Sequence, residues 1–114
     1  MFVMAKKSKA LFLPRKAKGE LETMGMQIKL ARKRRRISLA QMAERAQCSQ
    51  LTVMRVEKGE PTVSIGIYAR ILFGLGLDED LTLVAQKDPA GTVLVNNKIL
   101  KRNERNEDEY DVFD

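Results

Sequence analysis

Histidine is absent from this chain of 114 residues, and cysteine occurs only once. A zinc site needs several His or Cys ligands, and a disulfide framework needs paired cysteines. Neither is therefore expected, nor any other metal or cofactor. Aromatic residues make up 5% of the sequence and tryptophan is missing, so the core is expected to be aliphatic, built from Leu, Ile, Val and Met.

Long hydrophobic runs are missing as well. No segment approaches the roughly 18 apolar residues of a membrane-spanning helix, and the apolar residues 2–4 are too few for a signal peptide. We therefore expect a soluble cytoplasmic protein whose thiol is reduced. We do not expect an enzyme, because the chain lacks both histidine and a phosphate-binding glycine loop, and its acidic residues concentrate near the C-terminus.

Positive charge is concentrated in the first half of the chain. The formal net charge is +6, but residues 1–60 hold 15 of the 21 Lys and Arg residues and only 5 of the 15 acidic residues. The first half thus carries a net charge near +10 and the second half one near −4. Such asymmetry is typical of a protein that binds a polyanion such as DNA, although a plain solvated basic surface is the alternative.

The most informative segment covers residues 38–59, SLAQMAERAQCSQLTVMRVEKG. Ser38 followed three residues later by Gln41 is a capping box, which satisfies two backbone donors at the start of a helix. Ser49 is placed to cap a second helix, and Gly59 lies just beyond its end, where a left-handed cap favours glycine. The pattern predicts two short helices around a tight turn, the arrangement of a helix-turn-helix.

The second of these helices has an apolar side and a polar side. Val53 and Val56 are three residues apart and are expected to face the core. The residues left on the outer side are Gln50, Leu51, Thr52 and Arg55. A polar outer side suits a helix that enters a DNA groove, so we expect this to be a DNA-binding recognition helix.

Each outer side chain has a contact that its chemistry favours. Gln50 can make two hydrogen bonds to an adenine edge, and Thr52 can donate to a phosphate or touch a thymine methyl group. Leu51 fits a thymine methyl group, with simple exposure as the alternative. Arg55 fits guanine O6 and N7 or a phosphate, with a surface ion pair as the alternative.

Phosphate contacts are expected around the recognition helix, because helix N-termini and basic side chains attract anions. The candidates are Ser38, Gln41, Ser49, Lys58, Thr62 and three arginines of the basic run 32–36, namely Arg34, Arg35 and Arg36. Glu57 is expected to pair with an arginine instead, since a carboxylate that faces phosphates is repelled. Cys48 is expected to pack in the core.

Helices are also expected on either side of the motif. Apolar residues at helical spacing predict a first helix from Leu21 to about Arg34. Ser64 is placed to cap a further helix over about 65–73. In that helix five residues are expected to pack inward: Ile65, Tyr68, Ala69, Ile71 and Leu72. Asp78 can then start a short fifth helix.

The C-terminal part of the chain is less clearly patterned. For residues 89–100 two interpretations remain, because Asp88 followed by Pro89 is typical of a helix start whereas residues 92–95 favour a strand. We divide the chain into a flexible basic arm over 1–19, a helix-turn-helix domain over 20–86, a C-terminal extension over 87–103 that is a candidate dimerisation segment, and an acidic tail over 104–114 that is expected to be disordered.

The stretch ARKRRRISLAQMAERAQCSQLTVMRVEKGEP resembles the XRE (Cro/C1-type) helix-turn-helix family over about residues 21–76. The continuation PTVSIGIYARILFGLGLDEDLTLVAQKDPAG resembles the branch of HipB-like antitoxins, which are encoded beside HipA-like serine/threonine kinase toxins. The resemblance implies an all-α, phage-repressor-like bundle of about five helices that forms a homodimer. It also implies binding to double-stranded DNA at a palindromic operator, repression of its own operon, association with the bacterial nucleoid, and a complex with a kinase toxin.

Two residues depart from that family. Leu39 stands where the family has a Gln that contacts DNA, so this contact is absent here or supplied by Gln41 or the basic run. Gln47 stands where the family turn often has Gly, which costs about 1 kcal/mol if the position requires a positive φ.

Two other functions remain alternatives. The chain can be a stand-alone or prophage-type repressor without a toxin. It can also be mainly a protein-interaction module, with Val112 and Phe113 of the tail docking on a partner. For the basic arm, tracking the DNA minor groove and plain disorder are both left open.

Overall fold

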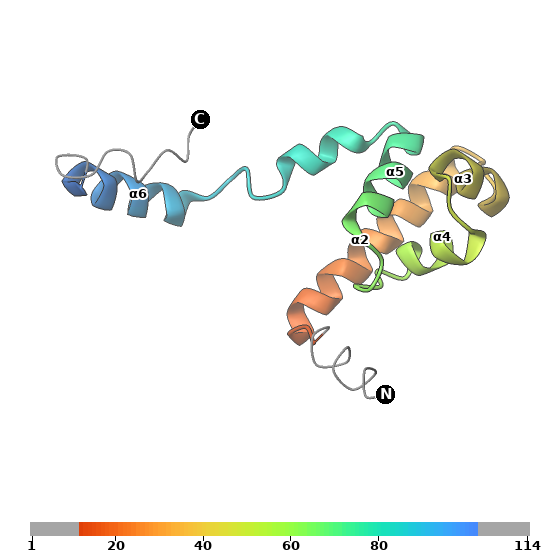
Figure 1. Cartoon of the computed structure of the whole chain (residues 1–114), viewed down its shortest axis with the longest axis horizontal. Helices are drawn as coiled ribbons and strands as arrows, with labels where there is room; N and C mark the ends of the chain where they lie inside the picture. The colour runs from red at the N-terminus through yellow and green to blue at the C-terminus, as the bar shows by residue number, and fades with distance from the viewer. Residues whose placement is uncertain (1–11, 103–114) are drawn as a thin grey trace. The chain divides into compact units, whose positions relative to one another are not determined.

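The computed structural model describes residues 12–102, and within this range it contains helices and turns and no strand (Figure 1). The expected all-α fold is therefore confirmed. The elements are the α-helices α2 (Arg15–Arg34), α3 (Leu39–Ala46), α4 (Gln50–Glu57), α5 (Ile65–Leu75) and α6 (Pro89–Arg102), and the 3-10 helix η1 (Asp78–Leu83). The acidic tail expected over 104–114 lies outside the described residues, as does most of the basic arm.

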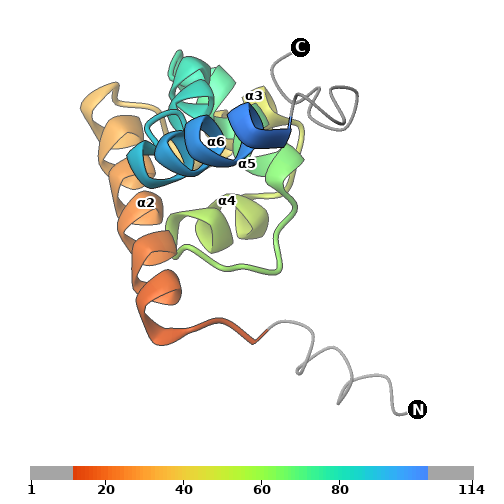
Figure 2. The same cartoon turned by 90° about the vertical axis from the view of Figure 1, so that its left-hand side faces the viewer.

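The chain forms two compact units, one ending at Leu81 and the other beginning at Thr82, so the boundary falls within η1. The first unit holds α2 to α5. Within it α3 packs against α4 and α5, and α2 packs against the same two helices (Figure 2). The helix-turn-helix pair of α3 and α4 is thus held between two longer helices. The described part of the second unit consists of the end of η1, a turn and α6.

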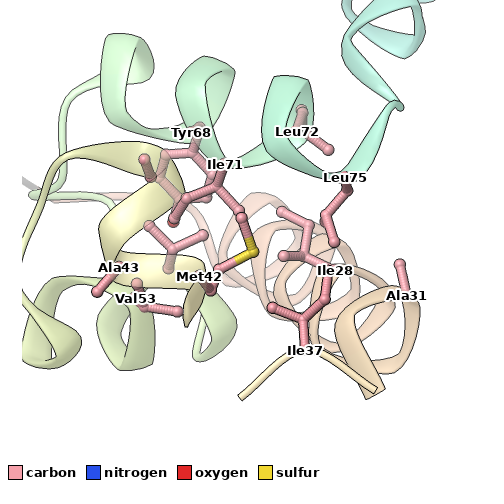
Figure 3. Packing of buried hydrophobic residues seen from close by; sticks show 12 residues of the cluster. Ile28, Ala31, Ile37, Met42, Ala43, Val53, Tyr68, Ile71, Leu72 and Leu75 are labelled. Carbon is pink, nitrogen blue, oxygen red and sulfur yellow. The ribbon is translucent and has the colours of Figure 1, made fainter. Parts of the chain in front are cut away.

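The core of the first unit is aliphatic, as expected from the composition. Met42, Val53, Val56 and Ile71 are fully buried, and Figure 3 shows Met42 among side chains from α2 and α5. Tyr68 is also buried and adds an aromatic ring to this cluster. Burial of each such side chain contributes about 1.5–3 kcal/mol to the free energy of unfolding. The same core also holds the inner side of α4 in place.

Side-chain caps start the helices where the sequence indicates. Ser38 Oγ accepts a hydrogen bond from the Gln41 backbone N–H at 3.0 Å, and Gln41 Oε1 accepts one from the Ser38 backbone N–H at 2.9 Å, which completes the capping box. Ser49 Oγ accepts from the Thr52 backbone N–H at 3.1 Å. Ser64 Oγ caps α5 in the same way, by accepting from the Ile67 N–H at 3.3 Å.

The first helix begins earlier than its apolar pattern indicates. We expected a start at Leu21, whereas α2 starts at Arg15, directly after Pro14. Residues 15–19, assigned to the flexible arm, are therefore helical. Arg, Lys and Ala are good helix formers, and Lys16 and Glu20 form an exposed i,i+4 pair at 4.0 Å. Neither feature produces an apolar period, so periodicity alone places the start too late.

Two further expectations about the later helices need correction. Ile65 was expected to pack inward, but it is 71% exposed, and it is the first residue of α5. The helix also continues past Phe73 to Leu75 and ends at Gly76, whose φ is +77°. The exposure of Ile65 follows from its position, because residues at the N-terminus of a helix have fewer packing neighbours than those in its middle.

Of the two interpretations for residues 89–100, the helix is the one that the structure contains. Asp88 Oδ1 accepts a hydrogen bond from the Gly91 N–H at 3.0 Å, and Pro89 is the first residue of α6. This is the N-cap and N1 arrangement that proline favours. The cap therefore outweighs the strand propensity of residues 92–95. The short helix expected after Asp78 is also present, as the 3-10 helix η1.

Gln47 offers a test of backbone strain. It is the C-cap of α3 and has φ 56° and ψ 48°, the left-handed conformation that glycine adopts at little cost. We predict that Gln47→Gly raises the free energy of unfolding by up to about 1 kcal/mol, measured by equilibrium urea denaturation. Gln47→Ala, which keeps a Cβ, should leave stability unchanged. A lower stability of the glycine variant would contradict the assignment of strain.

Candidate DNA-binding surface

The inner side of α4 is anchored by apolar packing and by one buried ion pair. Val53 and Val56 have no exposed surface. Glu57, on the same side, accepts two hydrogen bonds from Arg32 of α2, one from Nε at 2.6 Å and one from Nη2 at 3.2 Å. Arg32 Nη1 also donates to the carbonyl oxygen of Ile37 at 2.9 Å. The pair thus ties α4 to α2 and to the loop before α3.

The expected pairing of Glu57 with an arginine is therefore confirmed, and the structure identifies the partner. Both side chains are nearly buried, at 8% and 6% exposed for Arg32 and Glu57. A bidentate guanidinium–carboxylate contact of this kind is geometrically specific. Arg32 consequently differs from the rest of the basic run 32–36, because its charge is already neutralised by a buried partner.

A close approach of two backbones sets the distance between α2 and α4. Gly25 of α2 is buried, and a Cβ placed on it would lie 2.6 Å from Val56 O and 2.6 Å from Gly59 N. Gly59 has φ +74° and in turn faces the backbone of Leu21. Only glycine allows the end of α4 to lie this close to α2.

The outer side of α4 is open to solvent. Gln50, Leu51 and Arg55 are exposed, and Leu51 retains 54% of its accessible surface. Thr52 is half-buried, and its hydroxyl lies 2.9 Å from Ser49 Oγ. The structure therefore leaves three of the four expected base-contacting side chains exposed, while the hydroxyl of the fourth takes part in the cap of the helix.

The candidate phosphate-contacting residues lie on or next to the three connections that join α2 to α5. Arg34 ends α2, and Arg35 and Arg36 follow it, all three exposed. Arg35 Nη1 donates to the carbonyl oxygen of Ala31 at 3.0 Å, so one of its nitrogens stabilises the end of the helix. Arg36 has φ 55°, the left-handed conformation, which was not expected from its sequence context.

The remaining candidates are exposed and lie at helix ends or, in the case of Thr62, in a turn. Ser38 and Gln41 hold the start of α3 through their reciprocal cap, and Lys58 is the C-cap of α4. Thr62 lies in the turn between α4 and α5. That turn is fixed from inside, since the Tyr68 hydroxyl donates to the Glu60 carbonyl oxygen at 2.8 Å.

Cys48 shows no sign of a chemical role. It is partly buried against the core, as expected, in the turn before α4. Burial raises the pKa of its thiol above the ordinary value, an effect that the charge of Arg70 partly opposes. A raised pKa keeps the thiol protonated and poorly nucleophilic near neutral pH.

Neither a metal-binding cluster nor a membrane-spanning segment was found among residues 12–102. No group of three or more His, Cys, Asp or Glu side chains there could hold an ion. The helices in the same range are too short or too polar to cross a bilayer.

The chain matches the model of a known protein family. A family model described as a helix-turn-helix domain matches residues 23–84, which is more than half of the chain and includes α3, the turn and α4. Searches of curated proteins and of solved structures gave no match.

Proposed function

We propose that this chain, which belongs to the helix-turn-helix domain family, is a sequence-specific transcriptional repressor. Membership of the family itself supports the broader role of a DNA-binding regulator. The observation that carries the proposal is the two-sided construction of α4. Its inner side is fixed by Val53, Val56 and the buried Glu57–Arg32 pair, and its outer side presents Gln50, Leu51 and Arg55 to solvent. A helix held rigidly with exposed hydrogen-bonding side chains near its N-terminus is suited to reading base edges in the major groove.

In this proposal the exposed groups at the neighbouring helix ends position the protein on the DNA. Arg34, Arg35, Arg36 and Lys58 attract phosphates, and Ser38, Gln41, Ser49 and Thr62 add hydrogen-bonding groups at or near helix N-termini. Such contacts orient the recognition helix without carrying sequence information. Base contacts from Gln50 and Arg55 then select the operator, and both residues are expected to matter more for specificity than for general affinity.

The binding experiment compares the DNA upstream of the protein's own gene with a scrambled duplex. Fluorescence anisotropy at roughly 150 mM salt suppresses purely ionic binding. We predict a preference of about a thousandfold or more for the upstream DNA. Gln50→Ala and Arg55→Ala should lose most of this preference, whereas Lys58→Ala should weaken binding to both duplexes alike. Equal binding of the wild type to both duplexes would contradict sequence-specific recognition.

We further propose that the protein acts as a homodimer on a palindromic operator. One helix-turn-helix contacts only one half-site, and two half-sites lie about 34 Å apart along the DNA. The C-terminal extension over 87–103, which contains α6, is the proposed dimerisation segment. Analytical ultracentrifugation should give a dimer at micromolar concentration, and a monomer both with and without operator would contradict the proposal.

The resemblance of residues 61–91 to HipB-like antitoxins supports a more specific role. In this role the protein represses its own operon and binds the serine/threonine kinase toxin encoded beside it, and the protein itself is not an enzyme. Co-purification of the two gene products from a co-expressing cell tests the complex. An upstream or downstream gene that encodes no kinase would favour the stand-alone repressor instead, and the DNA-binding prediction would be unaffected.

A further inference from the structure

Leu51 is an exposed aliphatic side chain near the start of α4. It is the second residue of α4, its side chain is 54% exposed, and Gln50 and Arg55 beside it are also exposed. Exposed leucines are common on protein surfaces and are unremarkable singly. This one is notable for its place on the helix.

The helical rotation places Leu51 at the outermost point of the first turn of α4. Successive residues of an α-helix are rotated by about 100°. The buried residues Val53, Val56 and Glu57 define the inward direction, and Leu51 lies roughly opposite to their mean. Any surface that α4 approaches with its N-terminal half therefore meets Leu51.

Met54, the neighbouring apolar residue, is placed differently. It is 40% exposed and lines a groove between α2 and α4 together with Met26 and Leu39. Part of its apolar surface is therefore already covered by other apolar side chains. Leu51 lies opposite the buried residues and is more exposed than Met54, so a surface that contacts the first turn of α4 meets an apolar group there.

In the major groove the edges of the bases are hydrogen-bonding groups, except for the C5-methyl group of thymine. A leucine that covers a donor or acceptor removes its water and offers no hydrogen bond in return, which is unfavourable. A leucine that packs on a methyl group gains by removing both from water. Resting on the proposed function, we propose that Leu51 selects thymine at one position of each half-site by packing on its C5-methyl group.

The test replaces thymine by deoxyuridine in the operator that the binding experiment identifies. Deoxyuridine pairs as thymine does and differs only in lacking the methyl group. Anisotropy titrations should show that wild-type protein binds the uracil duplex about fourfold more weakly for each methyl that Leu51 covers, the equivalent of burying one methyl group. The Leu51→Ala variant should bind thymine and uracil duplexes with equal affinity.

A matched control separates this contact from a general effect of the base change. Leu83 is similarly exposed, at 57%, but lies on η1, so Leu83→Ala should keep the wild-type ratio between the two duplexes. Equal binding of both duplexes by wild-type protein that still prefers its operator over scrambled DNA would overturn this inference alone. A thymine preference that persists in Leu51→Ala would overturn it as well. Loss of all operator preference in the wild type would overturn the proposed function together with it.

Discussion

Replacing Glu57 by alanine is expected to lower the free energy of unfolding by about 3–5 kcal/mol, because it leaves the Arg32 guanidinium buried without its partner. The two side chains meet in a bidentate contact, and each is more than nine-tenths buried. A domain of this size has a total stability of only about 5–15 kcal/mol. The variant should therefore unfold at a much lower urea concentration in equilibrium denaturation, and α4 should lose its fixed orientation.

Two controls separate the burial of charge from its mere presence. Glu20→Ala removes the exposed partner of Lys16 and should barely change stability, because exposed ion pairs contribute little. Replacing both members of the buried pair, as Arg32→Met with Glu57→Leu, should recover much of the stability lost in Glu57→Ala. If Glu57→Ala were as stable as Glu20→Ala, the buried pair would not anchor the helix.

Adding one methyl group to Gly25 is expected to destabilise the domain by about 1–3 kcal/mol or more. The new Cβ would lie within 2.6 Å of Gly59 N and Val56 O and 2.7 Å from Glu57 O. These are backbone atoms that no rotamer change can move aside, so α2 and α4 have to separate. Urea denaturation of Gly25→Ala measures the cost.

Gly19 in the same helix provides a control with the opposite sign. Nothing lies within 4 Å of a Cβ placed there. Gly19→Ala should therefore stabilise α2 by about 0.5–1 kcal/mol, since glycine loses more backbone entropy in a helix than alanine does. If both substitutions shifted stability in the same direction, the close approach of α2 and α4 at Gly25 would not be the reason.

The sequence predicted those features of the fold that depend on a few neighbouring residues. The capping residues Ser38, Ser49 and Ser64 act within three residues of themselves, so the starts of α3, α4 and α5 follow from local chemistry. The inward direction of Val53 and Val56 follows from helical spacing in the same way. The family resemblance left open whether Gln47 requires a positive φ, and its φ is 56°.

Features that depend on distant residues could not be predicted in the same way. Glu57 was expected to meet an arginine, but the sequence did not indicate which one, and only the packing of α2 on α4 singles out Arg32. The importance of Gly25 was missed because its neighbour Gly59 is 34 positions away in the sequence. The signal available in the sequence was the helical spacing of Gly25 to the buried Ile28, which places a glycine on the packed side of α2.

The central claim is that the outer side of α4 contacts base edges in the major groove. Dimethyl sulfate modifies guanine N7, which lies in that groove, and adenine N3, which lies in the minor groove. In the complex of the protein with its operator, the proposed contacts predict that one guanine N7 in each half-site is protected from methylation. The Arg55→Ala variant should no longer protect this atom. Protection confined to adenine N3, with every guanine N7 still reactive, would contradict major-groove recognition by α4.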